Sequence, residues 1–241
     1  MVFFPLFEKE FFPMTYHLSH PEYFTLTAGD GKSLRGASQE WYKETWQRRA
    51  GCGPTTAATV LAYLSRVHKD LENLKPSGAA TAEDFLGYME EIWPYVTPGS
   101  RGLDKAESFV VGCRSFALAR GTVLLGEILE IPKKLRRNRP DLATCRQFIA
   151  KALKQDKPVA FLNYSNGDLN NLDSWHWVPL IAMTDGEGST LCTVLDEGEE
   201  RVIDFALWLE SSLLGGALAV VGPVGDGDLE KLFGQEQLSL F

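Results

Sequence analysis

The apolar residues of this chain change their period near residue 158, and this change constrains the fold more than any other feature. Before it, apolar side chains recur every three or four residues, which predicts amphipathic helices. After it, short apolar runs alternate with turn residues, which predicts strands. Helices followed by a mostly antiparallel sheet are typical of an α+β fold. We therefore predict that the 241 residues form an α+β domain.

Four helices are predicted in the first part of the chain, over residues 54–67, 81–93, 106–117 and 141–155. Pro54 suits a first helical turn, where its missing N–H group costs nothing. Thr81 with Asp84 three residues later resembles a capping box. The third segment carries a regular apolar stripe that includes Cys113, so we interpret this cysteine as a core residue.

The predicted strands follow, separated by turns at Asp185-Gly186 and Glu197-Gly198. They cover residues 158–164, 175–183, 190–195 and 217–221, with a short strand at 201–203 before a helix through Trp208. Three regions result. We predict an irregular N-terminal arm over residues 1–45, a main domain over 46–223, and a polar mobile tail over 224–241.

Composition excludes several classes of protein. Asp and Glu number 32 against 24 Lys and Arg, a formal charge of −8 that argues against direct nucleic-acid binding. No apolar run reaches the length of a membrane-spanning helix, and the apolar N-terminus is too short for a signal peptide, so we expect a cytoplasmic protein without membrane contact. The four cysteines form no Cys-x-x-Cys pair and do not cluster with histidines, so we expect no disulfide scaffold, metal or cofactor.

The segment Gln47 to Thr56 (QRRAGCGPTT) is the first candidate for chemistry, because it places Cys52 at the start of a predicted helix. A helix N-terminus stabilises a thiolate through its free N–H groups and its dipole, and the same groups can hold an oxyanion. We expect Gly51 and Gly53 to let a substrate backbone approach closely. The alternative is a buried cysteine beside a tight turn.

His176 and Asp196 are the second candidate, a base and the carboxylate that orients it. His176 begins one predicted strand and Asp196 ends the next. If these strands pair as a hairpin, the two residues become neighbours. Asp185 is a rival partner for His176, but it falls in the turn rather than at a strand end. The alternative interpretation of His176 is a histidine held between two tryptophans.

Four features, in this order, resemble papain-like cysteine peptidases of the C39-like group. They are Cys-Gly-Pro-Thr-Thr from Cys52, Lys-Pro-Val at 157–159, His-Trp-Val at 176–178, and Asp196. The resemblance covers roughly residues 40 to 221. It implies a central helix that carries the nucleophile and an antiparallel sheet that carries the base.

The resemblance also implies roles. It makes Cys52 the nucleophile, His176 the base and Asp196 its orienting carboxylate, with Gln47 and the Cys52 backbone N–H as the oxyanion hole. The chain departs from the group in three places. Gln47 lies five residues before Cys52 rather than six, Trp175 precedes the histidine where a glycine is common, and Glu197 follows the aspartate where a proline or aromatic residue is common.

The function implied is a cysteine hydrolase, a peptidase or amidase, that cleaves an amide bond of a peptide or protein substrate through a thioester acyl-enzyme. Acyl transfer shares this intermediate and stays open. A non-catalytic peptide-binding protein of the same fold is the main alternative. Four aromatic residues are candidates for the walls of a cleft: Trp46, Tyr164, Trp175 and Trp177.

The last five residues, Gln237, Leu238, Ser239, Leu240 and Phe241, resemble the short peptide by which bacterial proteins dock on the sliding clamp of DNA polymerase. Apolar anchors on a free tail suit a pocket on a partner. The alternative is a tail that packs on its own domain.

Overall fold

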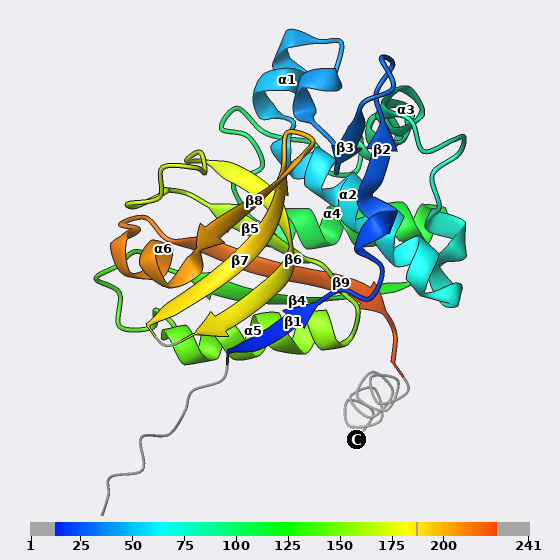
Figure 1. The fold of residues 1–241 in the computed structure, drawn as a ribbon. Helices are drawn as coiled ribbons and strands as arrows, with labels where there is room; N and C mark the ends of the chain where they lie inside the picture. The colour runs from blue at the N-terminus through cyan, green and yellow to red at the C-terminus, as the bar shows by residue number, and fades with distance from the viewer. Residues whose placement is uncertain (1–12, 187, 226–241) are drawn as a thin grey trace, which may run out of the picture.

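A computed structural model describes residues 13–186 and 188–225 of the chain, and it confirms the α+β layout (Figure 1). Its main sheet has seven strands, every pair of which is antiparallel, in the order β4-β9-β5-β6-β7-β8 with β1 also paired to β6. These strands are β1 (Met14–His17), β4 (Leu124–Ile131), β5 (Val159–Asn163), β6 (His176–Gly186), β7 (Ser189–Asp196), β8 (Glu199–Asp204) and β9 (Gly216–Pro223). A second sheet pairs β2 (Thr25–Thr27) with β3 (Ser33–Arg35).

The four predicted helices of the first part are confirmed as α2, α3, α4 and α5. The Thr81 hydroxyl accepts a hydrogen bond from the Asp84 N–H at 3.1 Å and so caps α3 as the sequence indicates. The helices are α1 (Thr45–Ala50), α2 (Cys52–Val67), α3 (Ala82–Ile92), α4 (Ala106–Ala119), α5 (Leu142–Lys154) and α6 (Phe205–Ser211), with 3-10 turns η1 (Pro21–Phe24), η2 (Gln39–Trp41) and η3 (Lys69–Leu74).

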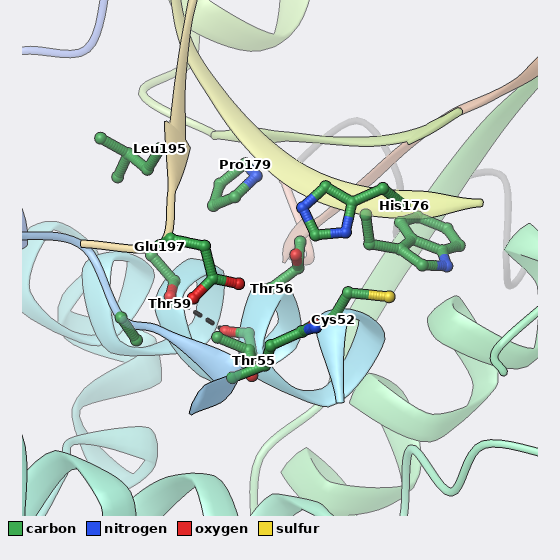
Figure 2. A pocket seen from close by; sticks show the side chains of 11 residues that line it. Cys52, Thr55, Thr56, Thr59, His176, Pro179, Leu195 and Glu197 are labelled. Carbon is green, nitrogen blue, oxygen red and sulfur yellow. Dashed lines mark hydrogen bonds between the residues drawn. The ribbon is translucent and has the colours of Figure 1, made fainter. Parts of the chain in front are cut away.

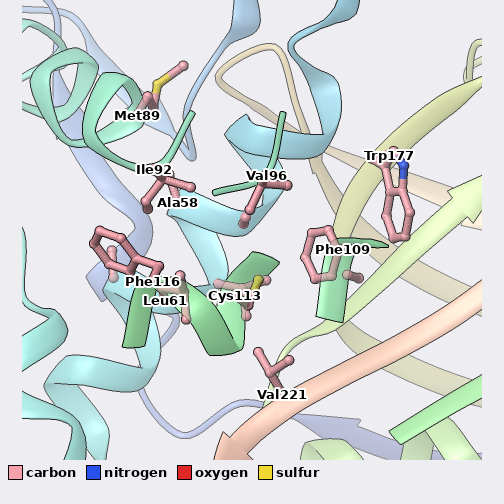
Figure 3. Close-up of a cluster of buried hydrophobic side chains, with 14 of the residues drawn as sticks. Ala58, Leu61, Met89, Ile92, Val96, Phe109, Cys113, Phe116, Trp177 and Val221 are labelled. Carbon is pink, nitrogen blue, oxygen red and sulfur yellow. The ribbon is translucent and has the colours of Figure 1, made fainter. Parts of the chain in front are cut away.

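The main sheet buries both of its faces, and strand β5 shows how. Ala160 and Leu162 point to the side of α2, α3 and α4, whereas Val159 and Phe161 point to the side of α5 and α6. Because successive side chains of a strand face opposite ways, a continuous apolar run serves two cores. Figure 3 shows the first core, in which Phe109 of α4 stacks on Trp177 of β6 with ring centroids 4.7 Å apart.

Helix α2 runs through the middle of this first core. Residues 52–65 of the helix are all buried, and it packs against β5, β6, α3 and α4. A helix without an exposed face is held by its surroundings on every side. Its first residue therefore has a fixed position beside the start of β6, which determines where Cys52 lies.

The N-terminal arm is more regular than the sequence predicted. Its described part, from residue 13, contains β1, β2 and β3, and β1 pairs with β6 through Tyr16 and Met183. Residues 14–17 thus belong to the main sheet rather than to an irregular segment. Strand β4 was also not predicted. No helix in the described ranges is long and apolar enough to cross a membrane. The tail from residue 226, including residues 237–241, lies outside the described residues.

Candidate active site

Cys52 is the first residue of α2, and 9% of its surface is exposed. The flanking glycines are required by packing. A Cβ on Gly51 would lie 2.8 Å from Tyr42 Cε2, and one on Gly53 would lie 2.7 Å from Leu103 Cδ2. Atoms of this chain therefore occupy the space that a Cβ would take at either glycine, and the expected approach of a substrate backbone stays a prediction.

His176 is the first residue of β6, and the sheet brings it to Asp196 at the end of β7. The two strands pair antiparallel, so the start of one lies beside the end of the other, and this predicted adjacency is confirmed. His176 Nε2 lies 2.7 Å from Asp196 Oδ1, which leaves Nδ1 for a second partner. Figure 2 shows the imidazole ring above Cys52, and both residues border one pocket.

Arg201 completes the surroundings of Asp196, and the sequence did not indicate it. The Arg201 guanidinium of β8 donates a hydrogen bond to Asp196 Oδ2 at 2.6 Å. The Asp196 carboxylate is almost fully buried, so each of its oxygens has one cationic or imidazole partner. The rival Asp185 lies at the other end of β6 and pairs with Arg146 at 2.8 Å.

The charges of this cluster shift its pKa values. Burial alone would lower the pKa of His176, but hydrogen bonds to Asp196 and Cys52 and the charges of both outweigh it and raise the pKa to about 10. Burial likewise opposes ionisation of Asp196, yet the bond to His176 and the Arg201 charge hold its pKa below the usual value. The arrangement therefore favours an imidazolium beside a carboxylate.

Gln39, rather than Gln47, lies at the pocket shared by Cys52 and His176. Gln47 lies in α1, half-buried, and lines neither of the two cavities that Cys52 borders. Gln39 lies in η2 and lines the first of them, and its buried Oε1 atom has no hydrogen-bond partner within the described residues. This pocket has a volume of about 10 Å³, which is roughly the space of one water molecule.

The N-terminal arm brings Gln39 to this place by binding the β7–β8 hairpin. The Arg35 N–H donates to Gly198 O at 2.7 Å, and the Arg35 guanidinium pairs with Glu200. Ser38 donates a hydrogen bond from its hydroxyl to the Glu197 carboxylate. These contacts join segments more than 150 residues apart, so no local pattern in the sequence indicated Gln39.

Glu197 is a second carboxyl group at the pocket. It has a φ of 51° and is followed by Gly198 with a φ of 79°, values typical of the two-residue turn that closes a hairpin. Figure 2 shows its carboxylate directed toward the interior of the pocket. Burial and the charge of Asp196 raise its pKa, while the hydrogen bond from Ser38 opposes the rise.

The remaining cysteines have no comparable surroundings. Burial raises the pKa of Cys145 to about 12 and raises those of Cys113 and Cys192 still further. Across residues 13–186 and 188–225, no group of three or more His, Cys, Asp or Glu residues is placed to hold a metal ion. Cys52 is thus the thiol that lies beside a base.

No protein-family model matches this chain, and no curated protein matches it with significance. A functional assignment therefore depends on the geometry of the site.

Proposed function

We propose that this chain is a papain-like cysteine hydrolase of the C39-like group, a peptidase or amidase in which Cys52, His176 and Asp196 act as the catalytic triad. The observation that carries the proposal is the shared pocket of Cys52 and His176, with His176 Nε2 bonded to Asp196 at 2.7 Å. A nucleophile, a base and a residue that orients the base are the parts that acyl transfer to a side chain requires.

In the first half-reaction, His176 accepts the proton of the Cys52 thiol through Nδ1. The thiolate sulfur attacks the carbonyl carbon of an amide, and the carbonyl oxygen becomes an oxyanion. His176 then gives its proton to the leaving nitrogen, the C–N bond breaks, and a thioester to Cys52 remains. Asp196 keeps the imidazole oriented and stabilises its positive charge throughout.

In the second half-reaction, His176 takes a proton from a water molecule whose oxygen attacks the thioester. The C–S bond breaks, His176 gives its proton to the departing sulfur, the acid leaves, and the thiol is restored. An amine in place of water would give a new amide, so hydrolysis and transfer share the first half.

The narrow pocket suits the oxyanion. Its volume of about 10 Å³ accommodates an oxygen atom but no side chain. Two donors border it. The Cys52 N–H lies in the first turn of α2, where the helix itself offers no acceptor, and Gln39 has an amide N–H₂ group. We therefore assign to Gln39 the role that the resemblance gave to Gln47.

Alkylation by iodoacetamide tests the proposal without knowledge of the substrate. We expect Cys52 of the native protein to react at pH 6 at least tenfold faster than Cys113, Cys145 and Cys192, which peptide mass spectrometry distinguishes. The His176→Ala variant should slow Cys52 alone, because the thiolate loses its imidazolium. If Cys52 reacts no faster than the buried thiols, or if His176→Ala leaves its rate unchanged, the catalytic assignment fails and a peptide-binding protein is the better interpretation.

A further inference from the structure

Cys52 borders a second, wider cavity of about 220 Å³. One wall is Trp46 and Arg49 of α1, another is the turn of residues 99–103, and a third is Trp175 before β6. Figure 2 shows the Cys52 sulfur on the side of the residue away from Glu197. The wider cavity thus offers space for substrate side chains next to the reactive sulfur, which the narrow pocket lacks.

The charge of this cavity is opposite to that of the chain. The net charge of the protein is −8, yet the lining residues include Arg49 and Arg101 and, among those that the structure describes, no acidic one. Arg101 pairs with Asp104 at 2.8 Å, whereas Arg49 forms no ion pair with any described residue. An uncompensated cation at the mouth of a cavity attracts a negatively charged ligand and disfavours a positive one.

Hydrogen bonds within the turn of residues 99–103, and from the turn to β6, determine where Arg101 leaves the backbone. Gly99 and Gly102 exchange two backbone hydrogen bonds of 3.0 Å. The Trp177 indole N–H donates to Leu103 O at 2.7 Å and so ties the turn to the strand that carries His176. A charged group on a rigid wall discriminates between ligands better than one on a mobile loop.

Two exposed indole rings border the same cavity. Trp46 is 47% exposed and Trp175 is 51% exposed, which is unusual for so large an apolar side chain. Their faces would cover a flat or aliphatic group of a ligand. The Trp175 ring is supported from behind by Tyr164, with ring centroids 5.2 Å apart.

The backbone of Trp175 is strained. Its φ of 56° lies in the left-handed region, where a bulky residue costs about 1–3 kcal/mol. The two other non-glycine residues in this region that the structure describes are Asp156, whose residue type tolerates it, and Glu197 in its hairpin turn. No such reason applies to Trp175. A strained residue whose exposed ring borders the same cavity as Cys52 indicates a functional position.

We propose that this wider cavity selects peptides in which an acidic residue adjoins an aromatic one next to the scissile carbonyl. Arg49 and Arg101 would bind the carboxylate, and Trp46 and Trp175 would cover the aromatic side chain. The inference rests on the proposed function, because it takes Cys52 to be the nucleophile.

The charge preference is tested with iodoacetate and iodoacetamide, two reagents of nearly equal size that differ in charge. We measure the rate of Cys52 alkylation by iodoacetate divided by the rate with iodoacetamide. The ratio is compared between the wild type and Arg49→Gln/Arg101→Gln at low ionic strength. The ratio should fall about three- to tenfold in the double variant, and added salt should lower the wild-type ratio toward the same value. Arg114→Gln, on the exposed side of α4, is the charge control, and it should leave the ratio unchanged.

The aromatic preference is tested with three peptide vinyl sulfones that end in Phe-Glu, Phe-Gln or Ala-Glu. We expect Phe-Glu to inactivate the protein fastest. Glycine adopts a φ of 56° freely, so Trp175→Gly removes the ring without opposing the loop conformation. In Trp175→Gly, Phe-Glu should inactivate no faster than Ala-Glu. In the double arginine variant, Phe-Glu should inactivate no faster than Phe-Gln.

The outcomes separate the two proposals. Suppose that Cys52 reacts rapidly with iodoacetamide, but the three peptides inactivate the protein at equal rates and the iodoacetate-to-iodoacetamide ratio is the same in the wild type and the double arginine variant. The substrate inference is then overturned and the catalytic assignment stands. If Cys52 does not react rapidly with iodoacetamide, the catalytic assignment fails, and the substrate inference fails with it.

Discussion

At the scale of single residues, the site depends on a carboxylate that two groups share. Asp196 accepts from His176 through Oδ1 and from Arg201 through Oδ2, and both partners favour its ionised form. A buried carboxylate without such partners would take up a proton and lose its hold on the imidazole. His176 and Asp196 could be found in the sequence because each lies at the end of a strand. Arg201 could not, since nothing in an exposed strand identifies which side chain turns inward.

Arg201→Gln should therefore shift the pH profile of Cys52 alkylation. Without the guanidinium, the pKa of Asp196 rises, so reactivity on the acidic side should be lost at a higher pH than in the wild type. Arg146→Gln is the matched control, because it breaks the ion pair with Asp185 at the far end of β6. We expect each variant to lose about 1–2 kcal/mol of stability. Identical alkylation profiles for the two variants would contradict the role of Arg201.

At the scale of elements, the close approach of α2 to its neighbours positions the thiol. The helix starts between Tyr42 and Leu103 with no space for a Cβ at Gly51 or Gly53. The glycines that flank Cys52 are visible in the sequence, but the reason for them is not. They resemble residues that admit a ligand, whereas in space a Cβ on Gly51 would meet the Gln47 backbone oxygen and the Tyr42 ring, and one on Gly53 would meet Leu103.

Two glycine substitutions distinguish packing from helix propensity. Gly53→Ala should destabilise the protein by about 1–3 kcal/mol, because its Cβ would lie 2.7 Å from Leu103 Cδ2 and 2.9 Å from Leu103 Cβ. Gly87→Ala, on the exposed side of α3 with no atom within 4 Å of the new Cβ, should stabilise it by about 0.5–1 kcal/mol. Urea unfolding of both variants measures the difference. A stabilising Gly53→Ala would refute the packing account.

At the scale of the whole molecule, the sequence predicts those elements whose own periodicity is strong. A strong apolar periodicity is present in helices α2 to α5 and in strands β5, β6, β7 and β9. Strand β4 does not, because its burial follows no alternation and its partner β9 lies some 90 residues later. Strand β1 is largely exposed and forms only because β6 offers it a free edge. Gln39 reaches the pocket through the same kind of long-range contact, so its place beside Cys52 and His176 could not be predicted.

The stability of the whole molecule should depend on pH through the titration of His176. Folding raises its pKa from 6.5 to about 10 against the opposing effect of burial, so the protonated ring stabilises the fold below pH 6.5 and this contribution is lost as the pH rises toward 10. Differential scanning calorimetry from pH 6.5 to 8.5 should show a wild-type Tm that falls with pH. In His176→Ala the fall should be smaller, since the other groups contribute equally to both proteins. The control His17→Ala, at an exposed position of β1, should reproduce the wild-type slope. If His176→Ala and the wild type have the same slope, folding adds no net proton to the protein through His176, and the raised pKa of this residue is contradicted.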